Sequence, residues 1–249
     1  MTMLAQFLKE RGRAVSGVDF ADVFMTDKVL RREHISVRIG FDAAKIPVDA
    51  VIIYSSAYTP ENNPEVAFIQ KNPEHFKKLP ILNYAQAIGA LFSSYRGIAV
   101  CGSHGKTTVT AWLGFVLKTA GLDPNVLVGA RVPQLKGSAI MGKSDYFIAE
   151  ADEYQDKLQY FQPYGIVLNN IDYDHPDYFK TKSAYYQAFA RFTKKLPAAG
   201  FLVANAGDVY IRKILPAVPG RIFTYALADK LSRQQPAVSL LGHSVRRAG

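Results

Sequence analysis

The sequence predicts an α/β protein built on parallel sheets, and three observations support that prediction. Short apolar segments alternate with segments of helical spacing along most of the 249 residues, an order typical of parallel strands covered by helices. One apolar segment leads into a glycine-rich turn that ends in Gly-Lys-Thr at 105–107. Polar residues directly follow several other apolar segments, and in parallel sheets such strand ends lie at the ligand-binding edge.

The composition is that of a globular protein with one large domain or two smaller ones. Hydrophobic residues make up 49% of the chain and charged residues 20%, and no apolar run approaches the roughly 20 residues of a membrane span. Without a signal-peptide pattern, we expect a cytoplasmic protein with no membrane contact. The net charge is +9, but the basic residues are scattered, which favours a phosphate-rich small substrate over nucleic acid. The single cysteine, Cys101, ends an apolar run and is expected to be a buried structural thiol.

The first part of the chain predicts four strands, each joined to a helix. Apolar spacing from Met3 to Leu8, closed by Gly12, predicts an opening helix. Short apolar runs that end at polar residues predict strands, and apolar residues three and four apart predict helices. The strands are expected at 14–18, 35–39, 50–54 and 80–82, and the further helices at 24–32, 64–72 and 84–93. We expect a boundary at 95–97 between two domains.

The second part repeats this pattern. Strands are expected at 98–101, 125–128, 146–149, 166–168 and 200–204, and helices at 107–120 and 184–195. Gly102, Glu150, Asn170 and Asn205 each follow or end one of these strands, so we expect them at one crevice. Residues 232–249 show no clear period.

The segment 98–108 has the layout of a phosphate-binding loop. An apolar strand leads into Gly102-Ser103-His104-Gly105-Lys106-Thr107-Thr108, and helical spacing follows. Glycines let backbone N–H groups approach phosphate oxygens, and the helix N-terminus adds partial positive charge. We expect Lys106 to meet the outer phosphates of ATP or GTP and Thr107 to bind Mg²⁺, and we interpret His104 as a turn residue. The first glycine of the usual pattern would fall on Val100, so an ordinary strand-turn-helix corner is the alternative.

Polar residues follow three other predicted strands. Glu150-Ala151-Asp152-Glu153 follows 146–149 and predicts a magnesium ligand beside the loop, with a solvated acidic turn as the alternative. His175 stands among carboxylates, which favours a ligand or orienting role, although magnesium does not prefer imidazole. Ser55 and Ser56 either donate to a phosphate or sugar or cap a turn.

Five motifs in the same order give residues 1–225 a resemblance to the Mur ligases. The loop 102–108 is similar to the Gly-Thr-His-Gly-Lys-Thr-Thr of that family, 150–154 to its Glu-Ala-Asp-Glu segment, and 170–179 to its Asn-Ile-x-x-Asp-His segment. Upstream, Ser16-Gly-Val-Asp19, and Ser55-Ser-Ala57 with Asn63-Pro-Glu65, are similar to motifs of its sugar-nucleotide domain.

The resemblance implies an ATP- and Mg²⁺-dependent ligase that joins L-alanine to the carboxylate of UDP-N-acetylmuramate in peptidoglycan synthesis. ATP would convert the carboxylate to an acyl phosphate, which the amine of L-alanine then attacks. By motif match, the catalytic residues would be Lys106, Glu150 and His175. Thr107 and Glu150 would hold one Mg²⁺, and His175 would hold a second at the acyl phosphate. The ATP-binding residues would be Gly102, Ser103, His104, Gly105, Lys106, Thr107 and Thr108. The substrate-binding residues would be Ser16, Asp19, Ser55, Ser56 and Asn170.

The resemblance also implies a domain organisation. Residues 1–95 would form an incomplete Rossmann-like domain that binds the UDP-sugar and lacks the family's first strand and glycine loop. Residues 96–249 would form a truncated ATP-binding P-loop domain with a parallel sheet, without the family's C-terminal domain, which a complementing fragment would carry. Two alternatives stay open: an inactive ATP-binding fragment, and the related ligase that reattaches a recycled tripeptide to UDP-N-acetylmuramate.

Overall fold

The computed structural model describes residues 1–21, 24–76, 79–132 and 137–226. The chain divides into two compact units, Met1–Ile88 and Gly89–Gly249. This division falls inside helix α4 (Tyr84–Phe92), and the boundary predicted at 95–97 follows the end of the same helix. None of the helices in these ranges is long and apolar enough to cross a membrane. The segment 232–249, for which the sequence predicts no period, lies outside the described residues.

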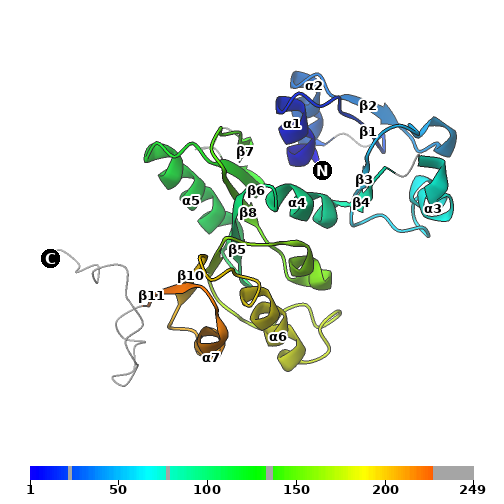
Figure 1. The fold of residues 1–249 in the computed structure, drawn as a ribbon. Coiled ribbons are helices and arrows are strands. Elements are labelled where there is room, and N and C mark those ends of the chain that lie inside the picture. Colours follow the sequence, from blue (N-terminus) through cyan, green and yellow to red (C-terminus); the bar gives the residue numbers. More distant parts are fainter. Residues whose placement is uncertain (22–23, 77–78, 133–136, 227–249) are drawn as a thin grey trace. The chain divides into compact units, whose positions relative to one another are not determined.

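The first unit contains two parallel strand pairs (Figure 1). Strand β1 (Ser16–Asp19) pairs with β2 (Ser36–Ile39), and β3 (Ile52–Tyr54) pairs with β4 (Ile81–Asn83). Within the described part of this unit the two pairs belong to separate sheets. The helices that accompany the strands are α1 (Thr2–Glu10), α2 (Met25–Arg32), α3 (Pro64–Lys71) and the start of α4.

Local sequence explains where the helices of the first unit begin and pack. Leu4 and Phe7 lie one turn apart on α1 and are both buried, as an amphipathic helix requires. Helix α3 begins after Asn63, whose side-chain oxygen accepts hydrogen bonds from the backbone N–H groups of Glu65 and Val66. Pro64 occupies the first helical position, where a missing N–H costs nothing.

The second unit is built on one seven-stranded sheet with the order β11-β10-β9-β5-β8-β6-β7. Its strands are β5 (Arg96–Cys101), β6 (Asn125–Val132), β7 (Gly137–Ile140), β8 (Tyr146–Glu150), β9 (Gly165–Leu168), β10 (Phe201–Asn205) and β11 (Arg221–Tyr225). Adjacent strands are parallel, as predicted, except that β7, which the sequence did not predict, runs antiparallel to β6. The connection between β6 and β7 is short, and short connections join antiparallel neighbours.

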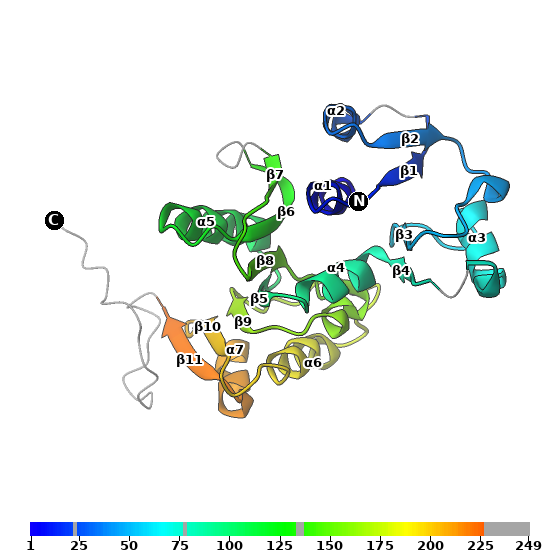
Figure 2. The same ribbon diagram turned by 45° about the horizontal axis from the view of Figure 1, so that its top comes forward.

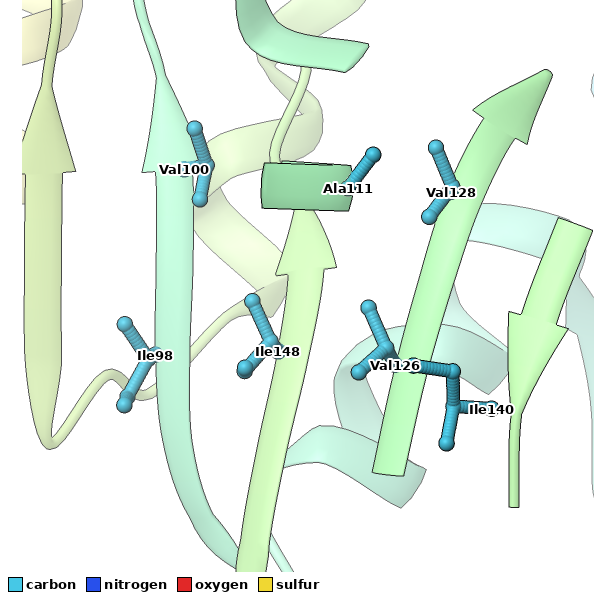
Figure 3. Close-up of a cluster of buried hydrophobic side chains, with 7 residues drawn as sticks. All are labelled: Ile98, Val100, Ala111, Val126, Val128, Ile140 and Ile148. Carbon is cyan, nitrogen blue, oxygen red and sulfur yellow. The ribbon is translucent and has the colours of Figure 1, made fainter. Parts of the chain in front are cut away.

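Helices cover both faces of this sheet (Figures 1 and 2). Helix α5 (Lys106–Thr119) lies against one face, and α6 (Lys182–Thr193) and α7 (Val209–Ile214) lie against the other. Under α5, a cluster of buried aliphatic side chains fills the core (Figure 3): Ile98, Val100, Ala111, Val126, Val128, Ile140 and Ile148. Gly114 allows the close packing of α5, because a Cβ there would lie 2.8 Å from a Val126 methyl group. Strands β7 and β11 and helix α7 were not predicted.

Candidate active site

The loop between β5 and α5 has a backbone that requires glycine at two positions. Gly102 has φ 131° and Gly105 has φ 78°, values that other residues rarely adopt. A Cβ on Gly102 would also lie 2.8 Å from the backbone oxygen of Asn170. Gly105 is the N-cap residue of α5, and no described side chain caps this helix. The first N–H groups of α5 are therefore available to an anion.

Two asparagines after β9 hold this loop in place. The backbone N–H of His104 donates to Asn170 Oδ1 at 2.8 Å, and Asn170 Nδ2 donates to the carbonyl oxygen of His104 at 3.1 Å. Asn169 Nδ2 donates to the same oxygen at 3.3 Å. The His104 ring is exposed, with Nε2 3.7 Å from a carboxylate oxygen of Asp172. Asn170, predicted to bind substrate, thus braces the phosphate-binding loop in this structure, and its role toward substrate stays a prediction.

Lys106 forms an ion pair with a buried carboxylate. Its Nζ lies 3.2 Å from Glu153 Oε2, and the Glu153 side chain is 0% exposed. Lys106 also donates to the backbone oxygen of Gly102 at 2.8 Å. A buried carboxylate is tolerated only when it is paired and hydrogen-bonded, and Lys106 supplies the charge. The sequence placed Glu153 in an acidic cluster, but nothing local showed that it is the buried member of that cluster.

Thr107 and Glu150 form a second pair at the same end of the sheet. Thr107 Oγ1 donates to Glu150 Oε2 at 3.1 Å, and the backbone N–H of Gly129 donates to Glu150 Oε1 at 2.5 Å. Glu150 ends β8, which lies next to β5 in the sheet. The structure therefore brings together the hydroxyl and the carboxylate that the sequence proposed as ligands of one Mg²⁺. Thr108 is exposed in the first turn of α5.

His175 lies with the carboxylates of Asp152 and Glu153. Ligand atoms of Asp152, Glu153 and His175 lie within 4.8 Å of one another. His175 has φ 55°, and its ring packs beside that of Tyr154, with 4.6 Å between centroids. Asp152 is already paired with Lys157, whose Nζ lies 3.0 Å away. His175 thus lies in a group separate from Thr107 and Glu150, and the roles of these residues as ligands of two metal ions stay predictions.

A buried tyrosine connects the acidic cluster to the loop. Tyr185, on α6, is 0% exposed, and its hydroxyl donates to Glu153 Oε1 at 2.9 Å. The same hydroxyl lies 2.7 Å from Ser103 Oγ, and Ser103 Oγ accepts from the backbone N–H of Asp172 at 2.8 Å. Burial raises the pKa of the Tyr185 phenol, so it remains a donor at neutral pH. No motif singled out Tyr185, because it resembles the other core aromatic residues of its helix.

The burial of Cys101, at the end of β5, indicates a structural thiol. The side chain is 0% exposed, and burial raises the pKa of its thiol well above the ordinary value. Because the thiolate is the nucleophilic form, a buried protonated thiol is inert. The predicted structural role of Cys101 is confirmed.

The predicted substrate residues of the first unit are only partly brought together. Asp19 ends β1 and accepts a hydrogen bond at 3.4 Å from the hydroxyl of Tyr58, in the loop after β3. Ser55 and Ser56 open that loop, and Ser55 Oγ accepts from the backbone N–H of Ala57 at 3.3 Å, which is a turn-capping contact. Ser16 stands at the opposite end of β1 from Asp19. Their roles toward a ligand stay predictions.

Glu65 and Asn63, from the upstream motif Asn63-Pro-Glu65, have structural roles. Glu65 is buried, and its carboxylate lies 2.6 Å from Arg38 Nη2 and accepts from the backbone N–H of Asp42 at 2.7 Å. With the Asn63 cap, these contacts join the start of α3 to the end of β2.

The mostly parallel sheet, the glycine loop and the helix that begins at Lys106 define an α/β protein of the P-loop class. The Mur ligase middle domain matches residues 100–244, and the catalytic domain of the Mur ligase family matches residues 1–96. The chain therefore belongs to the Mur ligase family.

Several relatives are named for one activity. The UDP-N-acetylmuramate–L-alanine ligase of Desulfitobacterium hafniense is 39% identical over 231 residues, which cover 92% of this chain and 49% of that protein. The ligase of the same name from Borreliella burgdorferi is 38% identical over 234 residues, with 91% and 49% coverage. The chain thus spans about half the length of these curated relatives.

Solved structures of the family share the fold. The UDP-N-acetylmuramate:L-alanyl-γ-D-glutamyl-meso-diaminopimelate ligase from Neisseria meningitides superposes with a TM-score of 0.76 at 28% identity, covering 90% of this chain and 74% of that one. UDP-N-acetylmuramate–alanine ligase from Thermotoga maritima gives a TM-score of 0.74 at 22% identity, covering 90% of this chain and 50% of that one. The second likeness shows the fold alone.

Proposed function

We propose that this chain supplies the sugar-nucleotide-binding and ATP-binding domains of a ligase that joins L-alanine to the carboxylate of UDP-N-acetylmuramate in peptidoglycan synthesis. Residues 1–95 would bind the UDP-sugar, and 96–249 would bind ATP. The observation that carries the proposal is the pairing of Lys106 with Glu153 and of Thr107 with Glu150 at the first turn of α5. The names of the relatives support the choice of L-alanine. With ATP and a nucleotide sugar as its substrates, the reaction would take place in the cytoplasm.

The side chains at this turn fit a magnesium-bound nucleotide. Thr107 and Glu150 present hard oxygen donors 3.1 Å apart, the kind of ligand that Mg²⁺ prefers. Asp152, Glu153 and His175 offer a second set of donors within 4.8 Å. A bound Mg²⁺ would neutralise phosphate charge that develops during transfer.

In the first step, an oxygen of the muramoyl carboxylate attacks the γ-phosphorus of ATP, and ADP leaves. Lys106 binds the γ-phosphate with the N–H that otherwise donates to the backbone oxygen of Gly102, and its ammonium stays paired with Glu153. The N–H groups at the start of α5 hold the other phosphates. Since phosphoryl transfer depends mainly on positioning and charge stabilisation, these preorganised donors supply most of what the protein contributes.

In the second step, the nitrogen of L-alanine attacks the acyl carbon. The C–N bond forms, the bond from that carbon to the phosphate oxygen breaks, and phosphate leaves while the amine loses a proton. A tetrahedral oxyanion develops on the way, and fixed positive groups stabilise it. His175, beside the carboxylates of Asp152 and Glu153, would assist here as a metal ligand or as a hydrogen-bond donor.

The test is product formation followed by mass spectrometry. The purified chain is incubated with UDP-N-acetylmuramate, Mg·ATP and one of four acceptors: L-alanine, glycine, L-serine or the tripeptide. We expect an ATP-dependent product with L-alanine, if necessary only after the C-terminal half of the Desulfitobacterium relative is added. Product with the tripeptide alone would show the recycling activity. Binding of Mg·ATP without any product in either arm would show a nucleotide-binding fragment and refute the proposal.

A further inference from the structure

We propose that Tyr185 is a positioning residue that fixes the carboxylate of Glu153 and couples it to the phosphate-binding loop. The inference rests on the function proposed above, because it concerns the same nucleotide and metal site. Tyr185 lies on α6, on the face of the sheet opposite to α5. Its hydroxyl nevertheless reaches the buried centre of the site, 2.9 Å from Glu153 Oε1 and 2.7 Å from Ser103 Oγ.

Ser103 connects the Tyr185 hydroxyl to the loop after β9. Tyr185 donates its one proton to Glu153 Oε1, and Ser103 Oγ lies 2.7 Å from the Tyr185 hydroxyl. Ser103 Oγ also accepts from the backbone N–H of Asp172 at 2.8 Å and donates to the backbone oxygen of the same residue at 2.6 Å. The contacts therefore link the loop after β9, through the phosphate-binding loop, to the buried carboxylate.

Tyr185 and Lys106 contact different oxygens of the Glu153 carboxylate. Lys106 approaches Oε2 of Glu153, whereas Tyr185 and His175 face Oε1, at 2.9 Å and 3.9 Å. With both oxygens held, the carboxylate has one orientation toward the candidate metal position beside His175. Groups that orient a ligand from behind typically change metal affinity by 10- to 100-fold when they are removed.

The ring of Tyr185 has a separate, structural role. It makes edge-to-face contacts with Phe179 and Phe189, with centroids 5.1 Å and 5.3 Å apart. A phenylalanine at this position would keep these contacts and remove only the hydroxyl. Core packing alone gives no reason for a hydroxyl here, because a buried polar group costs free energy unless it forms hydrogen bonds.

The experiment measures Mn²⁺ affinity by electron paramagnetic resonance, with ATP present, for the full chain and for Tyr185→Phe. Tyr173→Phe is the matched control, because the Tyr173 hydroxyl donates to the backbone oxygen of Phe179 at 2.7 Å and its ring lies 5.8 Å from that of Tyr185. We expect Tyr185→Phe to weaken Mn²⁺ binding about tenfold or more, and Tyr173→Phe to leave it within twofold of the unmodified chain. Melting temperatures without metal are recorded for all three proteins.

The outcomes separate this inference from the proposed function. The Mn²⁺ affinity of ATP without the chain is the reference. If adding the unmodified chain to ATP does not raise the Mn²⁺ affinity above this reference, the proposed nucleotide site is wrong. If the unmodified chain binds Mn²⁺·ATP and Tyr185→Phe binds it equally well, the positioning role is wrong and Tyr185 is a packing residue. A lower melting temperature with unchanged Mn²⁺ affinity leads to the same conclusion. Should Tyr185→Phe fail to fold, Ser103→Ala removes the hydroxyl that lies 2.7 Å from that of Tyr185, and unchanged Mn²⁺ affinity there also overturns the inference.

Discussion

Replacing Lys106 by methionine should destabilise the second unit even without any nucleotide. Lys106 Nζ lies 3.2 Å from Glu153 Oε2, and Lys106 is 18% and Glu153 0% exposed. At that separation and an effective dielectric of about 20, the attraction is roughly 5 kcal/mol. Removing one member of a buried pair leaves the other uncompensated and typically costs about 3–5 kcal/mol. We therefore expect the free energy of unfolding to fall by about 3–5 kcal/mol.

The assay is urea denaturation, followed by the fluorescence of Trp112, the only tryptophan in the sequence, which lies on α5 in the second unit. Lys118→Met, an exposed lysine in the last turn of the same helix, is the control and should change stability by less than about 0.5 kcal/mol. Lys106→Met combined with Glu153→Gln should recover much of the loss, because the buried charge is gone. The reasoning is refuted if Lys106→Met costs no more than the control, or if the two substitutions are additive.

Three further predictions concern other parts of the chain. Gly102→Ala should lower the free energy of unfolding by about 1–3 kcal/mol, because of the positive φ and the contact of the new Cβ with the Asn170 carbonyl oxygen, and it should weaken binding of a fluorescent ATP analogue. Gly17→Ala is the control and should change neither, because the space around Gly17 is open. Asn63→Ala should lower the unfolding free energy of the first unit by about 1 kcal/mol, measured by circular dichroism in urea; no change would contradict the capping role. The hydrogen bond from Tyr154 lowers the pKa of Asp177, so its stabilisation is present above the ordinary carboxyl pKa and is lost as pH falls through the lowered value. Tyr154→Phe should move that pKa upward in a carboxyl NMR titration, and an unchanged pKa would show that the bond is not formed.

Much of the fold could be predicted from local pattern. The strands that lead into Gly102, Glu150 and Asn170 are apolar runs with polar ends, and such runs have few alternatives to burial in a sheet. The antiparallel strand β7 could not be predicted, because its direction depends on pairing with β6 rather than on its own residues. Helix α7 has six residues, too few for its apolar spacing to stand out.

The sequence by itself determined the phosphate-binding loop and the family, because glycine spacing and charged residues at strand ends are local features. Only the tertiary structure decided which acidic residue of 150–153 is buried, and that Lys106 pairs with Glu153 while Thr107 pairs with Glu150. It also decided that Tyr185 reaches this site from α6. The physical reason is that burial and pairing depend on contacts between residues far apart in the chain, and one sequence read locally contains no measure of those distances.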